Sequence, residues 1–472
     1  MGRNIRLYYF FRALSCAHMF KPFTYFFCMS RGLSVFEFML LYTIFSSAVI
    51  LLEVPTGAWA DRLGRRKSMA FGALLMGFSS LGYLMAHGFA VFAVCEFFFA
   101  VGLTLTSGAD SAFLYDTLKQ GGREEEYRRL EGVGTSAKHI GLMLAAIIGG
   151  VLATIHLALP YVATAVVSFA AVFAAFAMSE ARVWSGRAGS DGVLDAETRP
   201  TGKNATRPTR VFASFFRRFK ALRMFMGEAF SIIHRKPALL WAILYSSMIF
   251  VIIRMSDALY QPLLKDYGFD FLAMGAVFGI LNLVAAVSAR NVNGLTRKLT
   301  EKGVLWALPV VLIVSYMLLD ALGPFICVVL MMAQYSVTGV YSPFTKSIIN
   351  HEIGTSHVRA TVLSAESSVK RLVVAGVSPV LGWLISSYSL RAGLYACAGV
   401  GLLGTVAVLM VNRRRFTLGG SVGGPGKRGA KTGSGGPGDE ESGNVPKPET
   451  AIGAEVIGPD VVTADFVSEI KV

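Results

Sequence analysis

Long apolar runs separated by short polar segments dominate this chain, unlike the one-sided apolar stripes of helices in soluble proteins. A helix needs about 20 apolar residues to cross about 30 Å of hydrocarbon. Only helices and closed barrels pair all their backbone groups inside a bilayer, and runs of this length indicate helices. The pattern predicts an all-α membrane protein with twelve transmembrane helices, near residues 7–29, 35–59, 68–88, 90–115, 129–153, 157–180, 238–260, 271–292, 303–322, 324–349, 359–386 and 390–412.

Lysine and arginine gather in every second connection between these spans. The segments 62–67, 119–129, 290–302 and 346–359 are basic, whereas the connections between them are short and poor in cations. The positive-inside rule therefore predicts a multi-pass protein of the cell membrane with both termini in the cytoplasm. Hydrophobic residues make up 54% of the chain and charged residues 16%. The topology explains the formal net charge of +15, so this charge does not indicate a nucleic-acid partner.

One connection is far longer than the others and divides the chain into two halves of six spans. We expect an N-terminal half at 1–180, a cytoplasmic linker at 181–236, a C-terminal half at 237–412 and a disordered cytoplasmic tail at 413–472. Within the linker, residues 211–226 repeat phenylalanine at helical spacing opposite arginine and lysine. This pattern predicts a helix that lies on anionic lipid, with a partner-binding helix as the alternative.

A short basic motif between the second and third spans is the most informative segment. It has the pattern Gly57-x-x-x-Asp61-Arg62-x-Gly64-Arg65-Arg66. Its residue types, spacing and place between spans resemble the corresponding loop of major facilitator superfamily transporters. The resemblance covers roughly residues 7–412. It implies two six-helix pseudo-repeats and a monomer that works by alternating access. Helices one, four, seven and ten would line the central cavity, while two meets eleven and five meets eight across the halves.

The same resemblance implies a cytoplasmic latch. The loop aspartate of the family caps the start of helix eleven, and the arginine four residues later pairs with an acid at the end of helix four. Matched to this chain, Asp61 would lie near the helix that begins around Arg359, and Arg65 would pair with Asp116. The predicted latch comprises Gly57, Asp61, Arg62, Gly64, Arg65, Arg66, Asp116 and Arg359.

Charged residues within the spans form the list of candidates for transport chemistry. Each costs at least about 2.5–3.5 kcal/mol at membrane depth, so it usually faces a partner or a wet cavity. Asp110 lies in a segment of small polar residues on the fourth span and is the best candidate for a titrating carboxylate, with Glu53 next. The alternative for Asp110 is a structural acid paired with Lys138 or His139.

Several cations on spans predicted to line the cavity would suit an anionic substrate. Lys21 lies on the first span, and Arg254 and Asp257 share one face of the seventh, where they could also form a purely local salt bridge. Glu53 and the pair Lys370 and Arg371 are placed for an ion pair between spans two and eleven, which Glu366 could share. Tyr260 and Tyr335 are further candidates for substrate contact.

The chain contains no nucleotide-binding loop, metal-ligand cluster or nucleophile constellation, so we expect neither an enzyme nor a cofactor or metal site. A secondary transporter of a small organic solute remains. Segments 53–57 and 359–364 resemble bacterial members assigned to drug or metabolite efflux. The leading hypothesis is therefore proton-coupled export of small amphipathic or anionic molecules. The alternatives are a proton-coupled uptake symporter of an anionic metabolite and a non-transporting sensor or assembly protein of the same shape.

Overall fold

The computed structural model describes residues 2–180, 236–353 and 359–411, and every regular element in these ranges is a helix. The first half contains α1 (Gly2–Cys16), η1 (Lys21–Phe23), α2 (Thr24–Ser30), α3 (Val35–Leu63), α4 (Arg65–Met85), α5 (Phe89–Thr106), α6 (Ala109–Gln120), η2 (Glu124–Glu126), α7 (Tyr127–Ile155) and α8 (Leu159–Ala177). The second half contains α11 (Pro237–Asp266), α12 (Phe271–Arg290), α13 (Val292–Leu318), α14 (Pro324–Ile353), α15 (Arg359–Ser387) and α16 (Leu390–Val411). The expected linker and tail, including residues 211–226, lie outside the described residues.

Eleven stretches of the described chain are long and apolar enough to cross a membrane. They match eleven of the twelve expected spans. The prediction that one helix covers 7–29 is wrong, because this span divides into α1, η1 and α2, with residues 17–20 outside any helix. Pro22 lacks a backbone N–H and disfavours helix just before it, and the N–H of Met19 bonds to Thr164 Oγ1 at 2.9 Å instead of a helical carbonyl.

The fourth span, expected as one helix over 90–115, is also divided. It ends as α5 at Thr106 and restarts as α6 at Ala109. Gly108 lies between the two pieces with φ of +84°, a conformation that glycine adopts without a Cβ penalty. The two interrupted spans of the first half therefore each contain two helices. They are α1 and α2 in the first span, and α5 and α6 in the fourth, with α1 and α6 on the side expected to face the cytoplasm.

The ends of the bundle are named here by the topology that the sequence predicts. The inner end holds Gly64 and Gly122, and the outer end holds Gly32 and Gly268. At the outer end α3 begins with a capping box, in which Ser34 and Glu37 each bond to the other's backbone N–H. Asp270 caps α12 in the same way by accepting the N–H of Ala273 at 2.7 Å. These caps satisfy donors that the first turn of a helix leaves free.

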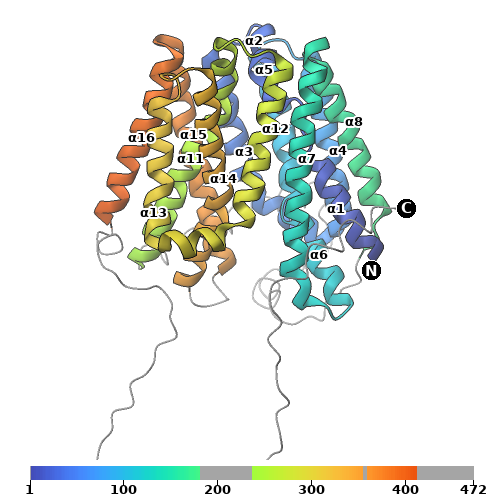
Figure 1. Ribbon diagram of the computed structural model, residues 1–472. Helices are drawn as coiled ribbons and strands as arrows, with labels where there is room; N and C mark the ends of the chain where they lie inside the picture. Colours follow the sequence, from blue (N-terminus) through green and yellow to red (C-terminus); the bar gives the residue numbers. More distant parts are fainter. Residues whose placement is uncertain (1, 181–235, 354–358, 412–472) are drawn as a thin grey trace, which may run out of the picture. The chain divides into compact units, whose positions relative to one another are not determined.

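The two halves meet along two helix pairs, α3 with α15 and α7 with α12, which the resemblance predicted. Figure 1 shows α7 and α12 side by side. Their contact depends on glycine, since a Cβ on Gly150 would lie 2.9 Å from the Cα of Gly275. In the other pair a Cβ on Gly382 would lie 2.7 Å from Cβ of Met39. Both of these glycine contacts between the halves lie toward the outer end.

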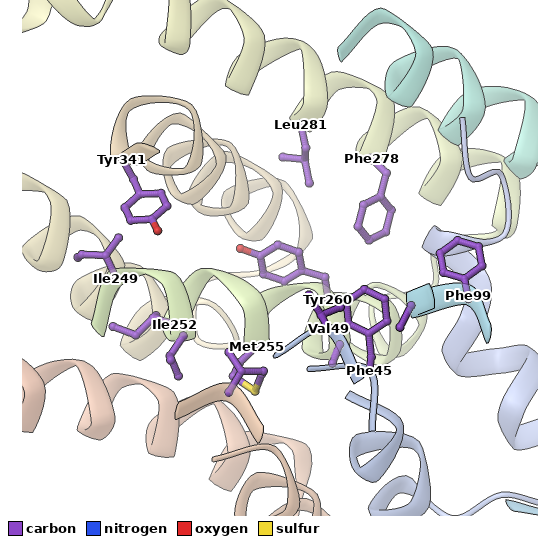
Figure 2. Packing of buried hydrophobic residues seen from close by; sticks show 14 of the residues in the cluster. Phe45, Val49, Phe99, Ile249, Ile252, Met255, Tyr260, Phe278, Leu281 and Tyr341 are labelled. Atoms are coloured by element: carbon purple, nitrogen blue, oxygen red, sulfur yellow. The ribbon is translucent and has the colours of Figure 1, made fainter. Parts of the chain in front are cut away.

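Apolar packing holds α11 among helices of both halves. Close packing of this kind stabilises helix association in lipid, where the hydrophobic effect between helices is absent. Figure 2 shows the side chains of this packing. They are Ile249, Ile252, Met255 and Tyr260 of α11, Phe45 and Val49 of α3, Phe99 of α5, Phe278 and Leu281 of α12, and Tyr341 of α14.

Candidate transport site

The carboxylate of Asp257 is the centre of a charged cluster that joins the two halves. Arg254, one turn earlier on α11, donates from Nη1 to Oδ2 at 3.1 Å. Tyr335 of α14 donates its hydroxyl to Oδ1 at 3.1 Å. Lys21 Nζ, from the first half, lies 4.0 Å from Oδ2. Lys21, Arg254, Asp257 and Tyr335 are called the central cluster below. The local salt bridge between Arg254 and Asp257 is present, but it is only one part of this arrangement.

The break in the first span positions Lys21 for this contact. Lys21 is the first residue of η1, directly after the non-helical residues 17–20. Gln261 of α11 holds the same segment, because its Nε2 donates to the carbonyl of Lys21 at 3.3 Å and its Oε1 accepts the N–H of Tyr25 at 2.8 Å. The Lys21 side chain remains 48% exposed, against 24% for Asp257. Lys21 is therefore the more accessible member of this ion pair.

The central cluster has more positive than negative charge. Two cations share the single carboxylate of Asp257, and the guanidinium of Arg254 also lies over the rings of Tyr42 and Phe45, 5.2 and 5.8 Å from their centroids. Lys138 interacts with Lys21 through the electrostatic field, and Glu96 interacts with both Arg254 and Lys21. The arrangement favours a ligand with one negative charge and a flat or apolar body.

Tyr260, predicted as a substrate contact, lies in a neighbouring neutral network and is fully buried. Its hydroxyl donates to Gln334, whose Nε2 donates to Ser315 Oγ at 2.7 Å. Ser256 and Tyr316 complete this network between α11, α13 and α14. Its hydrogen bonds are satisfied internally, so Tyr335 is the one of the two predicted tyrosines that reaches the central cluster.

A second charged cluster lies in the first half, where Asp110 forms an ion pair with Arg12 of α1. The alternative prediction, that Asp110 pairs with Lys138 or His139, is wrong. Arg12 is also 3.5 Å from Glu131 of α7, measured from Nη2 to Oε1. Arg12, Asp110 and Glu131 are called the inner triad below. Arg12 and Glu131 were not predicted as partners of Asp110, because the three residues lie on three different helices whose packing no spacing rule reveals.

The inner triad has the opposite charge balance from the central cluster. One guanidinium lies between two carboxylates, with side-chain exposures of 13% for Arg12, 9% for Asp110 and 25% for Glu131. Glu131 accepts further hydrogen bonds from the hydroxyls of Tyr8 at 2.7 Å and Ser111 at 3.1 Å. The triad therefore contains one more acidic side chain than basic side chains.

The predicted latch is only partly described. Arg65 Nε lies 3.8 Å from Asp116 Oδ2, so the expected ion pair between α4 and α6 is present. Arg66 donates to the carbonyl of Met178 at 2.8 Å, which ties α4 to the end of α8. Gly64 turns the chain with φ of +96°, where a Cβ would also meet Glu180 at 2.9 Å.

The remaining latch residues contribute less to the described site. Among the residues whose side chains are described, none has an atom within 4 Å of the position of a Cβ on Gly57. Asp61 and Arg62 lie in α3 and Arg359 begins α15, but their side chains lie outside the described residues.

The predicted ion pair between Glu53 and Lys370 is wrong. Lys370 pairs with Glu366 one turn earlier on α15, and Ser246 of α11 donates to the same carboxylate at 2.7 Å. Glu53 instead accepts a hydrogen bond from Ser367 at 3.4 Å, which still links α3 to α15. Arg371 interacts with Glu53 through the electrostatic field. The (i, i+4) spacing of Glu366 and Lys370 was the available sequence signal for the observed pair.

Solved transporters share this fold. A mutant of the nucleoside transporter NupG superposes with a TM-score of 0.69 at 12% identity, covering 87% of this chain and 99% of that one. A peptide transporter POT in complex with sulfate gives 0.61 at 14% identity, with 88% and 94% covered. A bacterial homologue of the human lysosomal transporter Spinster, inward-facing and unoccupied, gives 0.62 at 15% identity, with 87% and 96% covered. At these identities the likeness establishes the fold.

No curated protein is similar enough in sequence to count as a match. The sequence model of one family matches residues 10–375, which include the inner triad, the central cluster and the basic motif at the end of α3 and the start of α4. This match covers well over half of the chain and agrees with the transporter fold of the solved structures. The chain belongs to the Major Facilitator Superfamily and is a transporter.

Proposed function

We propose that this transporter exports small organic anions with an amphipathic body, in exchange for protons. The proposal depends on one observation: the two clusters have opposite net charge, and each contains a cation from the interrupted first span. The central cluster has an excess cation, and the inner triad has an excess carboxylate. Lys21 and Arg12 are nine residues apart in sequence, so a movement of α1 can affect both clusters.

The substrate would bind at the central cluster. A carboxylate or similar group can pair with Lys21 and replace part of its attraction to Asp257, while Arg254 keeps its contact within α11. The rings of Tyr42 and Tyr335 provide apolar and hydroxyl contacts for the body of the solute. Because Lys21 belongs to one half and Asp257 to the other, substrate binding changes an attraction between the halves.

The coupling proton would bind at the inner triad, with Asp110 as the group that must be able to ionise. A ligand can shift a conformational equilibrium only by its different affinity for the two states. Proton binding neutralises the excess charge of the triad, and substrate binding neutralises the excess charge of the central cluster. Each event thereby biases the same rearrangement of the first half.

Export from the cytoplasm and the predicted orientation belong to this proposal. They are supported by the resemblance of segments 53–57 and 359–364 to efflux members and by the basic connections at the inner end. Asp61 would cap α15 and act together with the Arg65–Asp116 pair as a latch. This latch would hold the inner end closed in the state in which the outer end is open. Residues 211–226 would rest on anionic lipid.

Transport by purified protein in vesicles with an imposed pH gradient tests the proposal. Benzoate, benzamide and benzylamine are probes of similar size that differ in charge. We expect proton-driven accumulation of benzoate, loss of accumulation but retained exchange in Asp110→Asn, and weakened benzoate transport in Lys21→Gln. Lys265→Gln, an exposed cation at the outer end of α11, is the matched control. Accumulation of benzoate by Asp110→Asn would exclude Asp110 from coupling, and a preference for benzylamine would exclude an anion site.

A further inference from the structure

The inner triad contains one more carboxylate than its cation can neutralise. Arg12 contacts Asp110 directly, and its second terminal nitrogen is 3.5 Å from Glu131. Its Nε is buried and has no hydrogen-bond partner within the described residues. Two ionised carboxylates around one guanidinium would leave a negative charge where solvation is poor. A proton on one of the two acids would make the triad neutral, since Arg12 supplies a single positive charge.

The surroundings of the two carboxylates are unequal. Asp110 has the direct contact with the guanidinium, and it accepts the N–H of Ser111 at 2.6 Å, so the ionised form is favoured. Glu131 has the longer contact and is otherwise bonded to two neutral hydroxyls. A hydroxyl can donate or accept, so Ser111 Oγ, 3.1 Å from Oε1, can accept a hydrogen bond from a protonated Glu131.

From this geometry we infer that Glu131 is a second proton-carrying residue, and that Arg12 binds one carboxylate at a time while the coupling proton occupies the other. In the present arrangement Arg12 binds Asp110, and Glu131 carries the proton. When Arg12 moves to Glu131, Asp110 becomes the protonated acid. The proton enters from and leaves to water, and the guanidinium stays charged throughout. This inference rests on the proposed proton coupling, but it assigns the proton to a pair of acids and not to Asp110 alone.

The positions of the three residues allow this exchange to move helices. Arg12 lies on α1 and Asp110 on α6, the inner pieces of the two interrupted spans, whereas Glu131 lies on the continuous helix α7. A change of partner therefore moves α1 relative to α6 and α7. The break after Cys16 connects α1 to Lys21 and the central cluster.

Other titratable groups also face the triad. Tyr8 bonds to Glu131, and Tyr127 of α7 interacts electrostatically with all three triad residues. His139, two turns after Glu131 on α7, interacts with Arg12. A neutral tyrosine or histidine does not change the charge count, so the shared proton belongs to the carboxylates.

Infrared difference spectra of the full-length protein between acid and alkaline pH test the inference with the proton as the only ligand. A protonated carboxyl group has a C=O band separate from that of a carboxylate. We expect one buried-carboxyl component that is lost in Glu131→Gln, because Arg12 and Asp110 then form a neutral pair. It is equally lost in Asp110→Asn, because Arg12 and Glu131 then form a neutral pair. Glu125→Gln, an exposed acid before α7, is the control and retains the component.

Glu131→Asp preserves the charge and should retain a shifted component, which separates proton binding from a purely structural role. Survival of the component in Glu131→Gln would overturn the inference and leave Asp110 as the lone proton site. Loss of the component in Glu131→Asp, with the control unchanged, would also overturn it. Neither result depends on transport, so failure of the proposed function, shown by benzoate accumulation in Asp110→Asn, is a separate observation.

Discussion

The two halves of this transporter have similar helices but opposite designs at the positions that would line the cavity. In the first half, spans one and four are interrupted at residues 17–20 and 107–108, and their inner pieces are connected by buried charges. In the second half, the corresponding helices α11 and α14 are each continuous over 30 residues. Polar groups between them form the neutral network around Gln334, beside the contact of Tyr335 with Asp257.

This difference indicates a division of labour. An interrupted helix can bend at its non-helical residues without breaking further backbone hydrogen bonds, whereas α11 and α14 stay helical through their internal prolines, Pro262 and Pro343. Charged groups respond to protons and anionic solutes, whereas a satisfied neutral network does not. We therefore expect the first half to respond and move, while the second half, through Asp257, provides the fixed partner for Lys21.

The largest effect should come from removing the cation of the inner triad. Arg12→Gln leaves two buried carboxylates without their partner, and breaking a buried pair in this way costs about 3–5 kcal/mol. Arg254→Gln in the second half should lower the free energy of unfolding by only about 1–2 kcal/mol, because Lys21 and Tyr335 still contact the carboxylate of Asp257. Thermal unfolding in detergent measures both. Equal destabilisation by the two variants would contradict the proposed difference between the halves.

The next effect concerns the contact between the halves at the outer end. Gly150→Ala places a Cβ 2.9 Å from Gly275, and such overpacking costs about 1–3 kcal/mol in the state where α7 and α12 touch. The equilibrium should shift toward opening of the outer end, by about tenfold for each 1.4 kcal/mol. Distances between spin labels at the exposed positions 155 and 272 report this opening.

Gly132→Ala is the matched control for this substitution. It lies on the same helix, and its Cβ would meet no atom within 4 Å. It should leave the label distances unchanged. Unchanged distances in Gly150→Ala as well would show that the glycine contact does not set the outer closure.

A smaller effect is expected at the break in the fourth span. Gly108 has φ of +84° and open space around its missing Cβ, so Gly108→Ala carries only the backbone penalty of about 1–2 kcal/mol. Gly376→Ala, helical and equally open on α15, should instead be neutral or stabilising. Hydrogen exchange around residues 104–112 should change only in Gly108→Ala. Greater stability of this variant would show that the break persists without glycine.

The sequence predicted the parts of this architecture that depend on one helix at a time. Apolar runs located eleven spans. The pairing of Arg65 with Asp116, which joins two helices, came instead from the family resemblance of the basic motif. The interruptions were not predicted, because hydropathy shows which residues are apolar and does not report the backbone conformation. Pro22 in the first span and Gly108 in the fourth were the local signals for them.

The partners of buried charges could be predicted only where they share a helix. Arg254 and Asp257 were paired correctly from their spacing, and the same rule would have found Glu366 and Lys370. The inner triad depends on how α1, α6 and α7 pack, which the positions of its residues along the chain do not specify. The direction of each side chain around its helix axis sets these contacts, and that direction follows from the fold.

The smallest predicted effect compares one serine from each half. Ser111→Ala and Ser315→Ala each remove a side-chain hydrogen bond between helices, from Ser111 to Glu131 and from Gln334 to Ser315. Such bonds within membranes contribute about 0.6 kcal/mol on average, so both variants should lose a similar, small amount of stability. Only Ser111→Ala should alter the pH profile of transport, because it removes a group that stabilises one protonation state of Glu131. Transport rates across a pH series, normalised to folded protein, distinguish the two. A displaced profile in Ser315→Ala would mean that the neutral network of the second half also responds to protons, and the division between a responsive half and a fixed half would fail.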